Sequence, residues 1–145
     1  MNKYRRLLCP VDFSDVSKHA FQIAIDLAVL FKADLHIMHV FHMPASTIPE
    51  GIYDIPDDME DKVKSHFSKK LDEFIKNYST LEINITTGSY AGFPHVEIIN
   101  SAKESNADMI VMGTHGRTGL SHVILGSVAE RVIRISDIPV LTVRK

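Results

Sequence analysis

The sequence predicts an α/β fold in which an open, parallel five-stranded sheet carries helices on both faces. Short apolar runs alternate along the chain with segments of helical period, and this alternation requires crossover connections between parallel strands. Most of the apolar runs are continuous, as in strands that are covered on both faces. The chain has 145 residues, 45% hydrophobic and 23% charged, so we expect one domain spanning residues 1–145.

Five segments have the character of strands. Three of them are short, mainly apolar runs, and residues 34–40 (D-L-H-I-M-H-V) also have strand character. The remaining one alternates apolar with polar residues, which is typical of a strand with one face less fully covered. The expected strands are residues 6–11, 34–40, 81–87, 108–112 and 138–143.

Four segments place apolar residues every three or four positions, which is the period of an amphipathic helix. Ser14 is a suitable N-cap for the first, and Pro94 can occupy the first turn of the third. The expected helices are residues 15–31, 57–78, 94–105 and 127–136. The connection over residues 41–56 is longer than usual, so we expect a functional or mobile loop there.

Charge and composition exclude several kinds of partner. The net charge of −2, without a lysine or arginine stripe, argues against nucleic acid, and no apolar span is long enough for a membrane helix. The single cysteine, Cys9, lies in an apolar strand, so we expect a buried and inert thiol. One cysteine cannot form an internal disulfide, which favours a reducing, cytoplasmic location.

The most informative segment follows the fourth expected strand. An apolar run ends there in a loop that contains Gly113 and Gly116, and Gly126 and Ser127 precede the last helix. Glycine lets a backbone approach an anion closely, and a helix start offers unpaired N–H groups. The pattern therefore favours a bound phosphate, although it matches neither a Walker loop nor a Rossmann fingerprint. From the glycine spacing alone, a turn that merely links strand to helix stays an alternative.

The spacing G-x2-G-x9-G-S, formed by Gly113, Gly116, Gly126 and Ser127, resembles the ATP-binding signature of the universal stress protein family. Three further segments resemble family strands, namely residues 7–14, 107–113 and 138–143. The resemblance implies the strand order 3-2-1-4-5, a Rossmann-like arrangement similar to that of adenine nucleotide alpha hydrolases. It also implies an ATP-binding stress-response or signalling module that hydrolyses ATP slowly or not at all.

With this strand order, ATP is expected between the first and fourth strands, and Mg or Mn can accompany its phosphates. The residues expected to contact the nucleotide are Pro10, Val11, Asp12, Val40, Met112, Gly113, His115, Gly116, Arg117, Gly126, Ser127 and Val128. Asp12 is expected to accept hydrogen bonds from the nucleoside, although an aspartate here can also cap the following helix. His115 and Arg117 can donate to phosphate, with simple solvent exposure as the alternative.

The resemblance further implies a homodimer that pairs the last strands of two chains. The expected interface residues are Ile138, Val140, Leu141, Thr142 and Val143. Two other functions stay open, a dimeric interaction module without nucleotide and a weak nucleotide hydrolase. The hydrolase needs a nucleophile with a base, and no G-x-S-x-G elbow occurs.

Three histidines, His36, His39 and His42, are spaced three residues apart and invite a metal assignment. On a strand, residues three apart point to opposite faces, so the spacing favours packing and loop histidines over a metal site.

Overall fold

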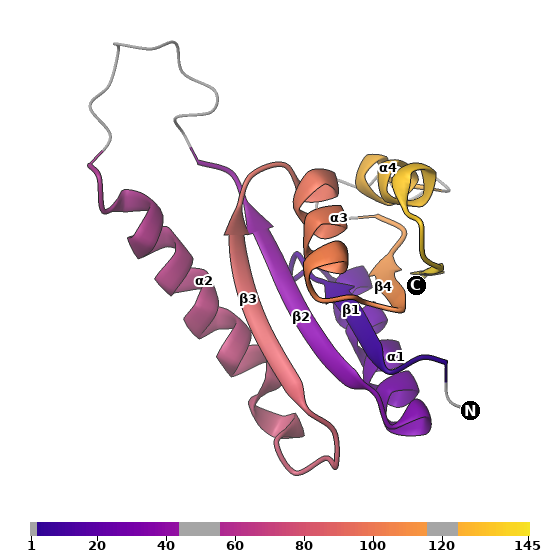
Figure 1. Ribbon diagram of the computed structural model, residues 1–145. Helices are drawn as coiled ribbons and strands as arrows, with labels where there is room; N and C mark the ends of the chain where they lie inside the picture. Colours follow the sequence, from indigo (N-terminus) through magenta and orange to yellow (C-terminus); the bar gives the residue numbers. More distant parts are fainter. Residues whose placement is uncertain (1–2, 44–55, 116–124) are drawn as a thin grey trace.

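Five parallel strands form one sheet in the order β3-β2-β1-β4-β5 (Figure 1). The computed structural model describes residues 3–43, 56–115 and 125–145, and all statements of structure refer to these. The strands are β1 (Arg6–Pro10), β2 (Asp34–Phe41), β3 (Ile85–Ala91), β4 (Met109–Gly113) and β5 (Val140–Val143). The predicted fold class and strand order are confirmed.

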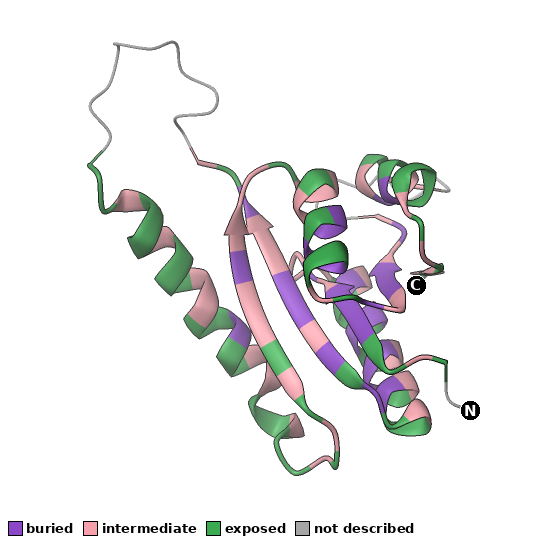
Figure 2. Cartoon of the chain, viewed as in Figure 1, coloured by how far each residue is buried: buried purple, intermediate pink, exposed green. Residues whose placement is uncertain are grey.

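Helices cover both faces of the sheet (Figure 1). They are α1 (Asp15–Phe31), α2 (Met59–Ile75) with the short 3-10 helix η2 (Lys76–Tyr78), α3 (Pro94–Glu104) and α4 (Ser127–Ile135). A first core cluster, which includes Leu7, Leu35 and Val111, lies against α1 and α2. A second core cluster, which includes Leu8 and Ile110, lies against α3 and α4. Figure 2 shows buried residues along the central strands and exposed residues on the outer helix faces.

The N-cap of α1 is the one that the sequence predicts. The Ser14 hydroxyl accepts a hydrogen bond from the Ser17 N–H at 3.2 Å, which satisfies one donor of the first turn. At the other end, Lys32 takes a left-handed conformation (φ 52°), and its N–H reaches the carbonyls of Ala28 and Val29. Helix α1, which follows the central strand β1, is therefore capped at both ends.

The extent predicted for the third strand is wrong. The strand begins at Ile85 rather than at residue 81 and continues to Ala91, paired along its whole length with β2. Leu81 and Ile83 precede it and pack against the first core cluster instead. The buried hydroxyl of Ser89 donates to the Lys64 carbonyl of α2 at 2.9 Å, so a polar residue is satisfied inside the strand.

Smaller differences lie at the ends of other elements. The last strand begins at Val140 rather than at residue 138, because Ser136 and Ile138 form a turn before it. The Ile138 N–H donates to the Ser136 hydroxyl at 3.2 Å. Most of the expected loop at 41–56 lies outside the described residues.

Cys9 is fully buried in β1, and burial raises the pKa of its thiol, which therefore stays protonated at neutral pH. This environment agrees with the inert thiol predicted from the sequence. Among the described helices, none has the length and apolar character needed to cross a bilayer.

Candidate functional site

The carboxyl ends of β1 and β4 lie side by side, because these two strands are neighbours in the sheet. The helices that follow them leave in opposite directions, α1 to the face of the first core cluster and α4 to the face of the second (Figure 1). Open α/β sheets bind ligands at such a switch point. This is the place at which the sequence predicts a nucleotide.

The turn between β1 and α1 is held by β2. The Val11 N–H donates to the Met38 carbonyl, and the Val11 carbonyl accepts from His39 Nδ1, both at 2.8 Å. A carbonyl only accepts, so Nδ1 of His39 carries the proton. The backbone of Val11 is therefore bonded on both sides to one neighbouring strand.

Asp12 helps to order the start of α1. Its Oδ1 accepts from the Ser14 N–H at 3.0 Å, and its own N–H donates to the Ser17 hydroxyl at 3.2 Å. The capping role that the sequence left open is thus present. Asp12 also lies at the carboxyl end of β1, beside the switch point.

Phe13 adopts a left-handed backbone conformation (φ 64°), which is unfavourable for a large side chain. Its ring centroid lies 4.9 Å from that of His39 and 5.7 Å from that of Phe74. Lys70 places its Nζ 4.2 Å from the centre of the same ring, within the range of a cation–π contact. These contacts to β2 and α2 hold the strained turn in one conformation.

Gly113, the last residue of β4, packs directly against α1. A Cβ at this position would lie 2.7 Å from Cγ1 of Val16, so a larger residue would push the strand end away from the helix. The next residue, Thr114, donates its N–H to the Val143 carbonyl of β5 at 3.0 Å. The exit of β4 is therefore fixed to both neighbouring elements.

Gly126 brings the start of α4 against the exit of β4. Its N–H donates to the Thr114 carbonyl, and a Cβ would lie 2.8 Å from that oxygen and 3.1 Å from the Cα of His115. The sequence predicts that this N–H faces a phosphate. In the structure this N–H has an acceptor in the Thr114 carbonyl, and the lack of a side chain allows the two backbone segments to approach closely.

The first turn of α4 has no side-chain cap, because its N-cap residue is Gly126. The N–H groups of Ser127, Val128 and Ala129 stand at this end, where the helix dipole is positive. Nearby, Thr114 Oγ1 and His115 Nδ1 are buried and have no hydrogen-bond partner among the described residues. Backbone N–H groups of the first helical turn and two buried polar atoms without a described partner therefore lie together beside the exit of β4.

The other expected contact residues differ in what they can offer. Met112 is buried in the second core cluster, and Val40 and Val128 pack partly against the same cluster. Pro10 ends β1 and is half-buried. Gly116 and Arg117 lie outside the described residues.

The model of the universal stress protein family matches residues 3–144. The chain belongs to the universal stress protein family. It is 36% identical to universal stress protein MJ0531 of Methanocaldococcus jannaschii over 146 residues, which cover 99% of this chain and 84% of the relative. It is 33% identical to universal stress protein YxiE of Bacillus subtilis over 147 residues, which cover 97% and 99%. The solved structure of MJ0577 matches with a TM-score of 0.80 and 28% identity, covering 99% and 97% of the two chains.

The sequence did not identify His39 as a neighbour of the site. Its bond to Val11 joins residues 28 positions apart, and no local pattern signals such a contact. His36, by contrast, lies on the other face of β2 and bonds Thr86 and Tyr90. The two histidines therefore point to opposite faces, as the strand period predicts. Over residues 3–43, 56–115 and 125–145, no group of His, Cys, Asp and Glu is arranged to hold a metal ion.

Proposed function

We propose that this universal stress protein is a stress-response or signalling module that binds ATP at the carboxyl ends of β1 and β4. The observation that carries the proposal is the uncapped first turn of α4 beside buried, unpartnered atoms of Thr114 and His115. An anion there would accept from the N–H groups of Ser127 and Val128 and lie at the positive end of the helix dipole. A phosphate group meets these requirements.

The nucleoside would lie against the turn after β1. Pro10 and Val11 would line the adenine slot, together with the backbone of Val40 near the end of β2. The Asp12 carboxylate would accept a ribose or adenine donor in addition to the Ser14 N–H, since a carboxylate has more than one acceptor position. Gly116 and Arg117 would complete the phosphate contacts.

Two solved universal stress proteins that share the fold are in complex with adenine nucleotides. One is in complex with cAMP (23% identity, TM-score 0.66), and the other, from Archaeoglobus fulgidus, is in complex with dAMP (21% identity, TM-score 0.61). At these identities the likeness is one of fold. It supports the proposal because the same architecture accommodates an adenine nucleotide in those proteins.

ATP would act as a bound regulator that is hydrolysed slowly or not at all. The Asp12 carboxylate accepts from the Ser14 N–H, and the Ser14 hydroxyl accepts from the Ser17 N–H. Both side chains are thereby engaged in the cap of α1. A divalent cation, Mg or Mn, would be carried by the phosphates themselves. We infer a cytoplasmic location, where ATP is abundant and the free thiol of Cys9 stays reduced.

Ser127 is the residue at which the proposal is tested most cleanly. It is exposed at the first position of α4, so Ser127→Glu adds a negative charge without entering the core. We expect this variant to bind MgATP roughly tenfold more weakly by calorimetry, a change of about 1.4 kcal/mol. Its free energy of unfolding should not fall, because an acidic residue in the first turn of a helix is favourable.

Ser127→Gln is the neutral control of similar size and should bind MgATP like the wild type. Gly126→Glu is unsuitable, because even a Cβ at this position would collide with backbone atoms of Thr114 and His115. A wild-type protein that fails to bind ATP would favour the nucleotide-free interaction module. Accumulation of ADP with turnover would favour the hydrolase.

We also propose a homodimer formed through β5, which is an edge strand of the sheet. Leu141 on this strand is 38% exposed, and Ile133 and Ile135 on the adjacent helix α4 are 44% and 50% exposed. An exposed edge with apolar side chains is suited to pairing with a second strand. Val143 is buried in the first core cluster, and Ile138 and Val140 are half-buried against the second, so the most exposed part of the contact would be the β5 backbone and Leu141.

A further inference from the structure

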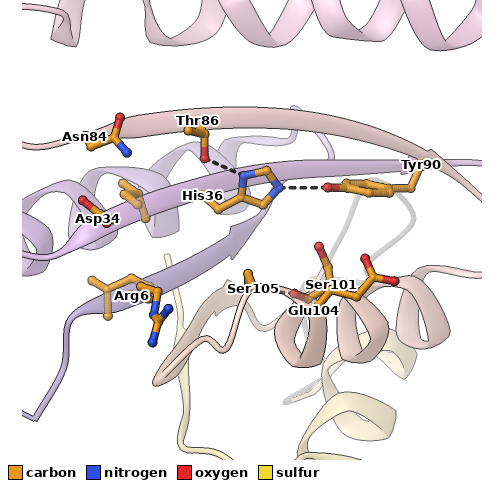
Figure 3. Close-up of a pocket in the computed structure, with 11 residues that line it drawn as sticks. Arg6, Asp34, His36, Asn84, Thr86, Tyr90, Ser101, Glu104 and Ser105 are labelled. Atoms are coloured by element: carbon orange, nitrogen blue, oxygen red, sulfur yellow. Dashed lines mark hydrogen bonds between the residues drawn. The ribbon is translucent and has the colours of Figure 1, made fainter.

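A cavity of about 360 Å³ lies on the α3 side of the sheet, near the amino ends of β1 and β2 (Figure 3). It thus lies toward the opposite end of β1 and β2 from the proposed nucleotide site. The side chains that matter below are Arg6, Asp34, His36, Thr86, Tyr90 and Glu104. We call it the His36 cavity.

The sheet side of the His36 cavity is a hydrogen-bonded row of three side chains (Figure 3). His36 Nδ1 lies 2.8 Å from Thr86 Oγ1, and His36 Nε2 lies 2.9 Å from the Tyr90 hydroxyl. The row depends on Gly88, since a Cβ there would lie 2.6 Å from the Tyr90 hydroxyl oxygen. Glycine thus leaves room for the tyrosine ring to lie back along β3 and reach the histidine.

One hydroxyl of this row always keeps a proton that it can donate to a further partner. Burial lowers the pKa of His36, so the ring is neutral at pH 7, with one donor and one acceptor nitrogen. In either tautomer, one hydroxyl gives its proton to the ring and the other accepts from the ring. The hydroxyl that accepts keeps its own proton for a further partner. The sheet side of the cavity can therefore donate a hydrogen bond to an acceptor atom of a ligand.

Charged groups of both signs line the His36 cavity. Arg6 and Asp34 are register partners on β1 and β2, and Glu104 belongs to the last turn of α3. None of the three forms an ion pair with another described residue. Two carboxylates disfavour a phosphate-bearing ligand, whereas Arg6 disfavours a simple cation. A molecule that carries one charge of each sign meets both conditions.

The α3 wall offers mainly acceptors. The Ser105 hydroxyl donates to the Ser101 carbonyl at 2.7 Å, so its oxygen can only accept from a ligand. Together with the Glu104 carboxylate, it is suited to a group with several N–H donors. The Arg6 guanidinium is suited to a carboxylate. A volume of about 360 Å³ is near the lower end for small-molecule sites.

We propose that the His36 cavity binds a small zwitterion of amino-acid size, with its ammonium group at Glu104 and its carboxylate at Arg6. The aliphatic part would lie over the ring of Tyr90. The site is separate from the proposed nucleotide site and does not depend on it.

The test uses four probes that separate the two charges. Glycine and 4-aminobutyrate carry both groups at different separations, whereas butylamine and butyrate carry one each. At about 50 mM, which detects weak binding, at least one zwitterion should shift the NMR signals of His36, Thr86 and Tyr90. Butylamine and butyrate should shift these signals much less. If neither zwitterion shifts them, or if a singly charged probe acts equally, the proposal is overturned.

Variants then test the two charge assignments. Glu104→Gln and Arg6→Gln should each weaken binding of the responding zwitterion by about fivefold, the upper range for a partly exposed ion pair. Arg5→Gln is the matched control, because Arg5 is exposed but does not line the cavity. Equal effects of Arg5→Gln and Arg6→Gln would overturn the assignment. MgATP affinity should be unchanged in all three variants, so the two proposals fail or succeed independently.

Discussion

His39 Nδ1 donates a hydrogen bond to the carbonyl of Val11 at 2.8 Å, which ties β2 to the turn that follows β1. The same imidazole lies 4.9 Å from the ring of Phe13 and 4.4 Å from the ring of Phe67, measured between centroids. One side chain therefore links the second strand, the turn and α2. This turn is the one that we propose to contact the nucleoside.

Replacing His39 by phenylalanine should separate its hydrogen bond from its packing. Phenylalanine keeps an aromatic ring against Phe13 and Phe67 but leaves the buried carbonyl of Val11 without its donor. We expect a loss of about 1–3 kcal/mol in the free energy of unfolding, measured with urea. His19→Phe, at an exposed position of α1, serves as the control. Equal stability of the two variants would show that the His39 bond contributes nothing.

Gly113→Ala should destabilise the protein by about 1–3 kcal/mol, because the new Cβ would overlap Cγ1 of Val16. Adding Val16→Ala removes the methyl group that is struck, so the double variant should lose less stability than the sum of the single variants. The same Val16→Ala change should not rescue Gly126→Ala, since the atoms struck there belong to the backbone of Thr114 and His115. Strict additivity in the Gly113 and Val16 cycle would refute the contact.

The buried imidazole of His36 should make stability depend on pH. Burial lowers the pKa of His36 in the folded protein below its usual value of about 6.5. As the pH falls below about 6.5, the unfolded chain binds the proton before the folded protein does. The contribution of His36 to the free energy of unfolding is therefore complete above about pH 6.5 and decreases as the pH falls toward the pKa of the folded protein. An NMR titration of the ring should give a midpoint below about 6.5, and His36→Asn should flatten the acid side of the stability profile. A midpoint at or above this value would be inconsistent with the burial described.

The proposed dimer predicts that a charge on β5 separates the chains. Leu141→Lys places an ammonium group on the exposed edge, so the wild type should sediment as a dimer and the variant as a monomer. Leu30→Lys is the control, since Leu30 is 72% exposed on α1. A monomeric wild type, or dissociation by Leu30→Lys as well, would argue against β5 as the interface.

The order of elements could be predicted because the spacing of apolar residues differs between strands and helices. The third strand shows the limit of this approach. The alternation of Leu81, Ile83 and Ile85 is the same as that of a half-buried strand, but only Ile85 lies in one. The actual strand contains Gly88, which has low strand propensity, and the polar residue Ser89. Their presence is explained by the ring of Tyr90 and by the Lys64 carbonyl, contacts that the sequence does not reveal.

The sequence predicted which strand ends and helix start border the candidate site, but not the contacts within it. The glycine spacing predicted a phosphate site between the exit of β4 and the start of α4, and the structure brings these two segments together through the Gly126 N–H and the Thr114 carbonyl. The spacing did not reveal the close packing of Gly113 against Val16 or of Gly126 against Thr114. The His36 cavity was not predicted, because its lining comes from three strands and a helix that only the fold brings together.

A map of backbone amide shifts on adding MgATP tests most directly where a phosphate would bind. The account predicts that the largest changes fall on Ser127, Val128 and Ala129, with a second group from Val11 to Ser14. Signals of His36 and Thr86 should stay in place. Amide shift changes confined to residues of the His36 cavity, or no shift changes at a high concentration of MgATP, would contradict a nucleotide site at the start of α4.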